Sequence, residues 1–155
     1  VTLRYFINQI DSLLEENEET SYLVLELMKG VVDGGTGGRL RFRYGLTSTI
    51  AGKTGTTDNN SDGWFIGLNP KLATAVWVGG ELRSIHFRST ALGQGASMAL
   101  PVYALFMKRC EKDPKLNFYK GDFDRPPTMS VDMDCSNYFQ EIDQGTIERE
   151  RNKEW

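Results

Sequence analysis

The spacing of hydrophobic side chains changes along the chain and predicts two helices with a group of strands between them. From residue 20 to 33, apolar side chains recur every three or four positions, which predicts an amphipathic helix. Gly34 and Gly35 follow it, and glycine takes the left-handed conformation that ends many helices at little cost. The same spacing predicts a second helix over residues 96–110, in which Pro101 is tolerated only near the first turn. The apolar positions of the first helix are Leu23, Val24, Leu27, Met28, Val31 and Val32.

Between the two helices, short runs of β-branched and aromatic residues predict strands at residues 47–57, 64–68 and 72–78. Residues 58–63 are all turn formers, and residues 69–71 make a link short enough for an antiparallel hairpin. Strands that follow one another directly, with helices flanking them, favour an α+β fold with an antiparallel sheet.

The two ends of the chain differ from this centre. Residues 1–10 are rich in β-branched and aromatic residues and predict a further strand. Residues 111–155 are polar and irregular, and within them we expect a packed arm or a short extra strand near residues 129–133. These differences divide the chain into a domain of residues 1–110 and a polar C-terminal extension of residues 111–155.

Composition narrows the range of functions. The chain has 155 residues, with 18 Lys and Arg against 21 Asp and Glu, and a net charge of −3 is too weak to indicate nucleic-acid binding. One histidine, His86, and two cysteines, Cys110 and Cys135, exclude a multi-histidine zinc site and a disulfide-dense scaffold. No apolar run reaches the ~20 residues of a membrane helix, so we expect a soluble chain.

Two glycine-rich segments suggest anion binding but fit it poorly. Gly52-Lys53-Thr54 resembles part of a nucleotide-binding loop, yet Thr47 stands where that loop needs its first glycine, and turn formers follow in place of a helix. Residues 34–38 are interpreted as a helix end and flexible loop. The alternating arginines after it would share one face of a strand, as a solvated edge or, less simply, an anion site; they are Arg39, Arg41 and Arg43.

The segment from Lys53 to Thr56 has more specific chemistry if it is a strand. Lys53 and Gly55 then point to one face, and Thr54 and Thr56 to the other. Lys53 would present a cation, Gly55 would allow close approach of a ligand, and the two hydroxyls would reach a carboxylate. A free backbone N–H on an edge strand would point at a developing oxyanion. These are the parts of an acyl-transfer site for a peptide that ends in a carboxylate.

The surrounding residues resemble the C-terminal half of the transpeptidase domain of penicillin-binding proteins, and most closely the class A, bifunctional proteins of the 1A type. The resemblance covers about residues 18–110. It rests on Lys53-Thr54-Gly55-Thr56-Thr57, on residues 62–70 and 75–79, and on residues 27–32, 35–37 and 93–97 with Pro101.

The resemblance implies a role for each residue of the motif. Lys53 and the backbone N–H of Thr56 would be catalytic, and the substrate-binding residues would be Lys53, Thr54, Gly55, Thr56 and Thr57. The ligands would be peptidoglycan stem peptides and β-lactams, with no metal and no organic cofactor. The parent protein would be membrane-anchored and periplasmic, with a glycosyltransferase domain. Trp64 and Trp77 are expected to build core rather than to contact a ligand.

The sequence also departs from the family pattern. No serine has a lysine three residues later, and the family's second motif, Ser-x-Asn, is absent. We therefore expect a fragment that supplies one catalytic element and is inactive alone, with a membrane contact only through parts not in this chain. Edge strands left open would allow pairing into a homo-oligomer.

The sequence leaves two questions open, one about function and one about the cysteines. A non-catalytic binding module, or a hydrolase similar to serine β-lactamases, would keep the same motif. A disulfide between Cys110 and Cys135 and two free thiols are equally compatible with the sequence.

Overall fold

The computed structural model describes residues 18–116 and 121–133 of the chain. The chain forms two units, residues 1–125 and 126–155, and every helix and strand of the described residues belongs to the first unit. In chain order the elements are α2 (Glu18–Asp33), α3 (Arg39–Phe42), β1 (Ala51–Thr56), the 3-10 helix η1 (Asp58–Asn60), β2 (Asp62–Asn69), β3 (Leu72–Gly79), α4 (Thr90–Gly93) and α5 (Gly95–Lys112).

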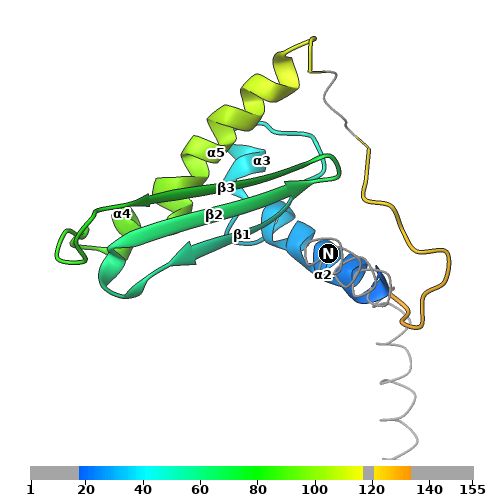
Figure 1. Cartoon of the computed structure of the whole chain (residues 1–155), viewed down its shortest axis with the longest axis horizontal. Coiled ribbons are helices and arrows are strands. Elements are labelled where there is room, and N and C mark those ends of the chain that lie inside the picture. The colour runs from blue at the N-terminus through cyan, green and yellow to red at the C-terminus, as the bar shows by residue number, and fades with distance from the viewer. Residues whose placement is uncertain (1–17, 117–120, 134–155) are drawn as a thin grey trace, which may run out of the picture. The chain divides into compact units, whose positions relative to one another are not determined.

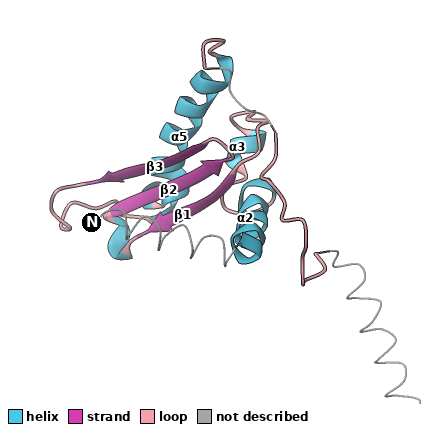
Figure 2. Ribbon diagram, turned by 45° about the vertical axis from the view of Figure 1, so that its right-hand side comes forward, coloured by secondary structure: helices cyan, strands magenta, loops and turns pink. Residues whose placement is uncertain are grey.

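The three strands form one antiparallel sheet in the order β1-β2-β3 (Figure 1). The predicted hairpin is confirmed, since β2 and β3 pair from Asp62 and Gly79 down to Asn69 and Leu72. Helix α5 packs against one face of this sheet, which we call the inner face (Figure 2). The predicted α+β fold with an antiparallel sheet is therefore confirmed.

The inner face is held by aromatic packing. Phe65 on β2 is fully buried, and its ring centroid lies 4.7 Å from that of Tyr103 on α5. Gly67 allows this approach, because a Cβ there would lie 2.6 Å from Cε2 of the Tyr103 ring. The Tyr103 hydroxyl is buried and has no hydrogen-bond partner among the described residues, and burial raises the pKa of Tyr103. The other core residues are Val32, Leu40, Leu46, Ile50, Ala99, Leu100, Ala104 and Met107.

Helix α2 ends at Asp33 as predicted, but Gly34 and Gly35 do not end it in the left-handed conformation. Gly34 instead donates a hydrogen bond to the carbonyl of Gly30, and further turns follow. The glycine at 35 is needed for space, because a Cβ there would lie 2.9 Å from the Val31 backbone. Much of the apolar stripe of α2 is open: only Val32 is buried, while Val24 and Leu27 are exposed.

The predicted strand at the alternating arginines is wrong, since residues 39–42 form the short helix α3. Helical winding lets Leu40 reach the core and sends the arginines to separate partners. Arg39 donates to the carbonyl of Ala96, at 3.1 Å. Arg41 donates to Asp33 at 2.8 Å and to the carbonyl of Ser48 at 2.7 Å.

The strand predicted at 47–57 is shorter than expected and begins at Ala51. Side chains hold the residues before it. Ser48 is buried, its carbonyl accepts from Arg41, and its hydroxyl donates to Glu111 on α5. These bonds satisfy polar groups of Ser48 outside the sheet, so the pairing of β1 with β2 begins three residues after Ser48, at Ala51.

Helix α5 confirms the second predicted helix, with two differences. Pro101 lies beyond the first turn, so the helix accommodates a missing N–H there. Val102, Leu105 and Phe106 are exposed, while the smaller Ala99 and Ala104 and the ring of Tyr103 face the sheet. Met98, Leu100 and Met107 are also buried, so the helix buries only part of its large apolar side chains.

Residues 121–133 contain no helix or strand, so of the two alternatives near 129–133 the short strand is wrong, and the packed arm stays a prediction. The strand predicted at residues 1–10 lies outside the described residues. No helix within 18–116 or 121–133 has the length and apolarity to cross a membrane. The division at residue 110 stays a prediction.

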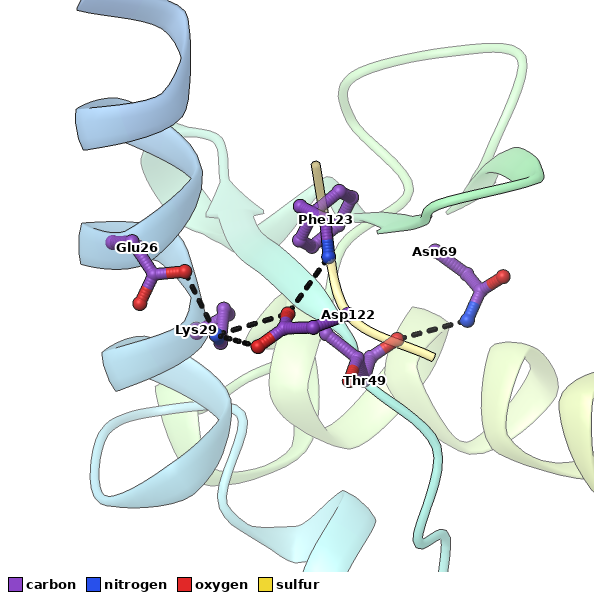
Figure 3. A network of polar contacts seen from close by, with 6 residues as sticks. All are labelled: Glu26, Lys29, Thr49, Asn69, Asp122 and Phe123. Carbon is purple, nitrogen blue, oxygen red and sulfur yellow. Dashed lines mark hydrogen bonds and ion pairs between the residues drawn. The ribbon is translucent and has the colours of Figure 1, made fainter. Parts of the chain in front are cut away.

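Residues 121–125 return to α2 through an ion pair (Figure 3). Lys29 lies 2.9 Å from Asp122 and 2.8 Å from Glu26. Burial lowers the pKa of Lys29, but hydrogen bonds to Glu26 and Asp122 outweigh it and raise the pKa above its usual value. The Lys29 hydrogen bond in turn lowers the pKa of Asp122.

A second polar contact in Figure 3 connects β2 to the segment before β1. The side-chain amide of Asn69, the last residue of β2, donates to the carbonyl of Thr49 at 3.0 Å.

Candidate functional site

Residues 53–56 lie in β1, at the edge of the described sheet, as predicted. The N–H of Thr57 donates to the carbonyl of Asp62 at 3.1 Å, so the Thr57 amide points toward β2. Successive residues of a strand direct their amides to opposite sides, so the amides of Thr56 and Thr54 point to the free edge. The ammonium of Lys53 donates to the carbonyl of Thr54 at 2.8 Å. Because the N–H and C=O of one residue in a strand point to the same side, this bond agrees with a Thr54 backbone that faces the free edge.

The register of β1 and β2 separates the motif side chains between two faces. Lys53 lies opposite Ile66 and Gly55 lies opposite Trp64, and directly opposed residues share a face. Lys53 is exposed on this side, which we call the outer face. Thr54 lies opposite the buried Phe65 and therefore belongs to the inner face.

Trp64 and Trp77 also lie on the outer face, so the prediction that they build core is wrong. Trp64 is 41% exposed and Trp77 is 46% exposed, and their ring centroids are 6.5 Å apart. The two-residue period of a strand explains this, because burying Phe65 forces its neighbour Trp64 to the opposite side. The outer face thus combines one cation with a pair of exposed indole rings.

The three threonine hydroxyls of the motif each have a partner within the chain. The Thr54 hydroxyl lies 3.1 Å from that of Thr36, and the Thr56 hydroxyl accepts from the N–H of Gly95 at 3.0 Å. The Thr57 hydroxyl donates to the carboxylate of Asp62 at 3.0 Å. Because Thr56 acts as an acceptor here, its own O–H stays available as a donor to a ligand.

Thr36 was not among the residues selected from the sequence, although it lies beside Thr54 in the structure. It sits between Gly35 and Gly37 in the turn that follows α2. A hydroxyl residue flanked by glycines is the available sequence signal, but only the fold brings this turn against the motif strand. Sequence reasoning had interpreted the turn as a flexible loop.

Asp62 is the second residue that sequence reasoning missed, since it was placed in a turn and within the resemblance but given no role in the site. One of its carboxylate oxygens accepts from the indole N–H of Trp77 at 2.8 Å, and the other from Thr57 at 3.0 Å and Ser61 at 3.4 Å. The hydrogen bond from Trp77, followed by that from Thr57, lowers the pKa of Asp62 below its usual value. The carboxylate therefore stays ionised and connects β3 to the end of the motif.

The only histidine of the chain does not join the motif. His86 lines an apolar hollow of about 340 Å³ at the C-terminal end of β3, and its ring nitrogen Nδ1 lies 3.1 Å from the carbonyl of Phe87. None of residues 53–57 lines this hollow. Its lining consists of Ser61, Val78, Gly79, Gly80, Ile85, His86 and Phe87.

Acidic, histidine and cysteine side chains form no cluster of three that could hold a metal ion within the described residues. Cys110 is free and buried on α5, and burial raises the pKa of its thiol. Cys135 lies outside the described residues. The chemistry of the site therefore rests on an exposed ammonium, hydroxyls and an open backbone amide, which suit the binding of an anionic peptide end.

Comparisons with known proteins show which proteins this chain is similar to. The chain is 33% identical over 129 residues to penicillin-binding protein 1B of Vibrio cholerae, which covers 80% of this chain and 16% of that protein. It is 40% identical over 88 residues to penicillin-binding protein 1A of Neisseria gonorrhoeae, which covers 57% of this chain and 10% of that protein. The crystal structure of penicillin-binding protein 1A from Haemophilus influenzae matches with a TM-score of 0.59 and 26% identity, over 70% of this chain and 16% of that one. No protein-family model matches the chain.

Proposed function

The chain is homologous to part of the penicillin-binding proteins 1A and 1B, and from this premise we propose that it supplies the Lys-Thr-Gly strand of a peptidoglycan D,D-transpeptidase. One observation carries the proposal. Residues 53–56 form an exposed edge strand that presents an ammonium on one face and a backbone amide along its free edge. The chain spans no more than about a sixth of the relatives it matches, so we assign the whole activity to a longer protein.

We assign the binding of the donor peptide to the motif. The ammonium of Lys53 neutralises the terminal carboxylate of a stem peptide. The hydroxyls of Thr54 and Thr56 project to the other face of β1, and we assign them to the same carboxylate where it lies along the free edge and the end of the strand. Gly55 leaves room for the peptide backbone, since a larger residue would add a side chain between Lys53 and Trp64. The N–H of Thr56 stabilises the oxyanion that forms at the attacked carbonyl. Thr57 directly follows the motif strand β1, and it contributes to binding indirectly, through its hydrogen bond to Asp62.

The nucleophile in this proposal is a serine outside the chain, because no Ser-x-x-Lys occurs in it. The serine oxygen bonds to the carbonyl carbon of the donor, the C–N bond to the terminal D-alanine breaks, and the departing amine takes up the serine proton. The nitrogen of an acceptor amine then bonds to the ester carbonyl carbon, the C–O bond to the serine breaks, and the proton lost by the amine returns to the serine oxygen. β-Lactams would enter the first step, with the ring C–N bond breaking instead.

We assign residues 1–110 to the transpeptidase domain and residues 111–155 to an extension of it. By homology we place the longer protein at the outer side of the cytoplasmic membrane, as a membrane-anchored protein. From the same similarity to penicillin-binding proteins 1A and 1B, we assign a glycosyltransferase domain to the longer protein.

Lys53→Ala in the full-length protein tests the proposal. Losing the cation that binds the carboxylate should lower the rate of labelling by a fluorescent penicillin by about 100-fold or more. Lys112→Ala is the matched control, since Lys112 is an exposed lysine at the end of α5. Both variants should melt within a few degrees of the wild type.

Two outcomes would contradict the proposal. Labelling of Lys53→Ala at the control rate would remove Lys53 from the site, and an equal loss of folding and labelling would make it a structural residue. The 155-residue chain by itself should not be labelled. Label that is gained and then rapidly lost in the full-length protein would instead favour a hydrolase similar to serine β-lactamases.

A further inference from the structure

We propose that Asp62 is a positioning residue for the reaction, which fixes the end of the motif strand and thereby the direction of the Thr56 amide. The inference rests on the proposed function, because it assigns Asp62 to the same site. Asp62 itself lies beyond the motif, at the first position of β2. Its role would be to act through Thr57, not to touch the substrate.

The turn between β1 and β2 is locked at its two ends by Thr57 and Asp62. The backbone N–H of Thr57 donates to the carbonyl of Asp62 at 3.1 Å. In return, the N–H of Asp62 donates to the hydroxyl of Thr57 at 3.0 Å, and this hydroxyl donates to the Asp62 carboxylate at 3.0 Å. Two residues thus share three hydrogen bonds, in which side chains replace part of the backbone ladder.

The turn that this lock closes contains two residues in the left-handed conformation. Asn59 and Asn60 have φ values of 62° and 55°, in a region that few residues other than glycine adopt and that asparagine enters more readily than most. Such residues persist where their surroundings fix them, and they occur often at functional sites. A carboxylate that holds both ends of the turn supplies such a constraint.

The third strand adds an anchor. Trp77 on β3 donates its indole N–H to the other Asp62 oxygen at 2.8 Å, so one carboxylate connects β3 to the residue that follows the motif. Hydrogen bonds to an ionised acceptor are shorter and stronger than neutral ones. Both oxygens are occupied, and the charge is used to hold geometry.

The consequence for catalysis follows from strand geometry. Thr57 points its amide toward β2, and this direction leaves the Thr56 amide pointing to the free edge. The Thr56 side chain is fixed from the other side by the N–H of Gly95. If Thr57 loses its hydrogen bond to the Asp62 carboxylate, the peptide unit at the end of β1 can rotate. The N–H of Thr56 would then no longer point at the oxyanion. Small displacements of this kind are costly in rate.

Asp62→Asn in the full-length protein tests the role. Asparagine keeps the shape but replaces one acceptor oxygen by an NH₂ group, so Trp77 and Thr57 can no longer both donate to it. We expect the acylation rate constant at saturating penicillin to fall about tenfold, while the dissociation constant of the non-covalent complex changes less than twofold. A merely structural role would lower the melting temperature without this split.

Asp58→Asn is the matched control. It removes the same charge four residues away, on an exposed side chain of η1, and should stay within twofold of the wild type in both constants. If Asp62→Asn and Asp58→Asn behave alike while Lys53→Ala is strongly impaired, the inference is wrong and the proposed function stands. If Lys53→Ala is also unimpaired, the proposed function itself fails.

Trp77→Phe keeps the inference testable if Asp62→Asn does not fold. This change leaves the carboxylate and removes one of its donors. A fall of about threefold in the same acylation rate constant would support the positioning role. An unchanged constant in a folded Trp77→Phe protein would overturn it.

Discussion

The two faces of the sheet are built from the same alternating sequence but differ in what orders their side chains. On the inner face, Phe65 packs on Tyr103, and glycine at 67 lets the helix come close. On the outer face, Trp64 and Trp77 stay more than 40% exposed beside Lys53. Burial holds one face together, whereas polar bonds such as that from Trp77 to Asp62 order the other.

This difference separates stability from chemistry along a single strand. Thr54 faces inward, toward the packed layer, while its neighbours Lys53 and Gly55 face outward. Substituting an apolar side chain of the inner face should therefore change the free energy of unfolding, and substituting a residue of the outer face should mainly change ligand binding. Neighbouring positions offer direct tests of this division.

The largest effect is expected for Phe65→Ala on the inner face. Removing a fully buried ring leaves a cavity against Tyr103 and should lower the free energy of unfolding by about 3–5 kcal/mol. Ile66→Ala, one residue along and 43% exposed, should cost about 1 kcal/mol or less. Urea unfolding of the 155-residue chain measures both, and similar costs for the two variants would refute the division between the faces.

Two glycines on opposite faces test the same division, with a smaller expected change in the free energy of unfolding. Gly67→Ala puts a methyl group 2.6 Å from Cε2 of Tyr103 and should destabilise the chain by about 1–3 kcal/mol. Gly55→Ala meets only the Trp64 side chain, at 3.2 Å, and should change stability by about 0.5 kcal/mol or less. In the full-length protein, Gly55→Ala should instead slow labelling by penicillin. A normal labelling rate for Gly55→Ala would remove the outer face from the site.

Local patterns were sufficient to predict much of the fold. Turn formers at 58–63 and a three-residue link at 69–71 define the strands and their hairpin, because these signals lie within a few residues of each other. The motif strand was predicted for the same reason. Alternation in β2 also predicts two faces, but it does not say which face receives α5.

The failures of sequence reasoning depend on partners that are distant in the sequence. The two tryptophans were assigned to the core because large aromatic residues are usually buried, and only the position of α5 shows which face is covered. The arginines at 39–43 alternate like a strand, but burial of Leu40 favours a helical turn. Asp62 and Thr36 acquire their partners only when the strands align.

The smallest effect concerns the polar bonds of the outer face. The hydrogen bond from Trp77, with that from Thr57, lowers the pKa of Asp62 in the folded chain. A lowered folded pKa adds stability above the unfolded value, near ~3.9 for aspartate, and this contribution is lost as the pH falls through the folded pKa. Trp77→Phe should raise the pKa of Asp62 toward its usual value, which NMR titration of the carboxyl carbon measures.

The pH dependence of stability distinguishes this bond from simple ring packing. The difference in stability between Trp77→Phe and the wild type should be largest at neutral pH. It should shrink as the pH falls below the usual aspartate pKa and through the lowered pKa of Asp62 in the folded wild type, because Asp62 becomes protonated in both proteins only below that point. Trp64→Phe changes the ring packed 6.5 Å from Trp77 and leaves the indole N–H of Trp77 in place. Its effect should be independent of pH, because apolar contact does not titrate. An Asp62 pKa that is unchanged in Trp77→Phe would mean that the outer face is ordered by aromatic packing, as the inner face is.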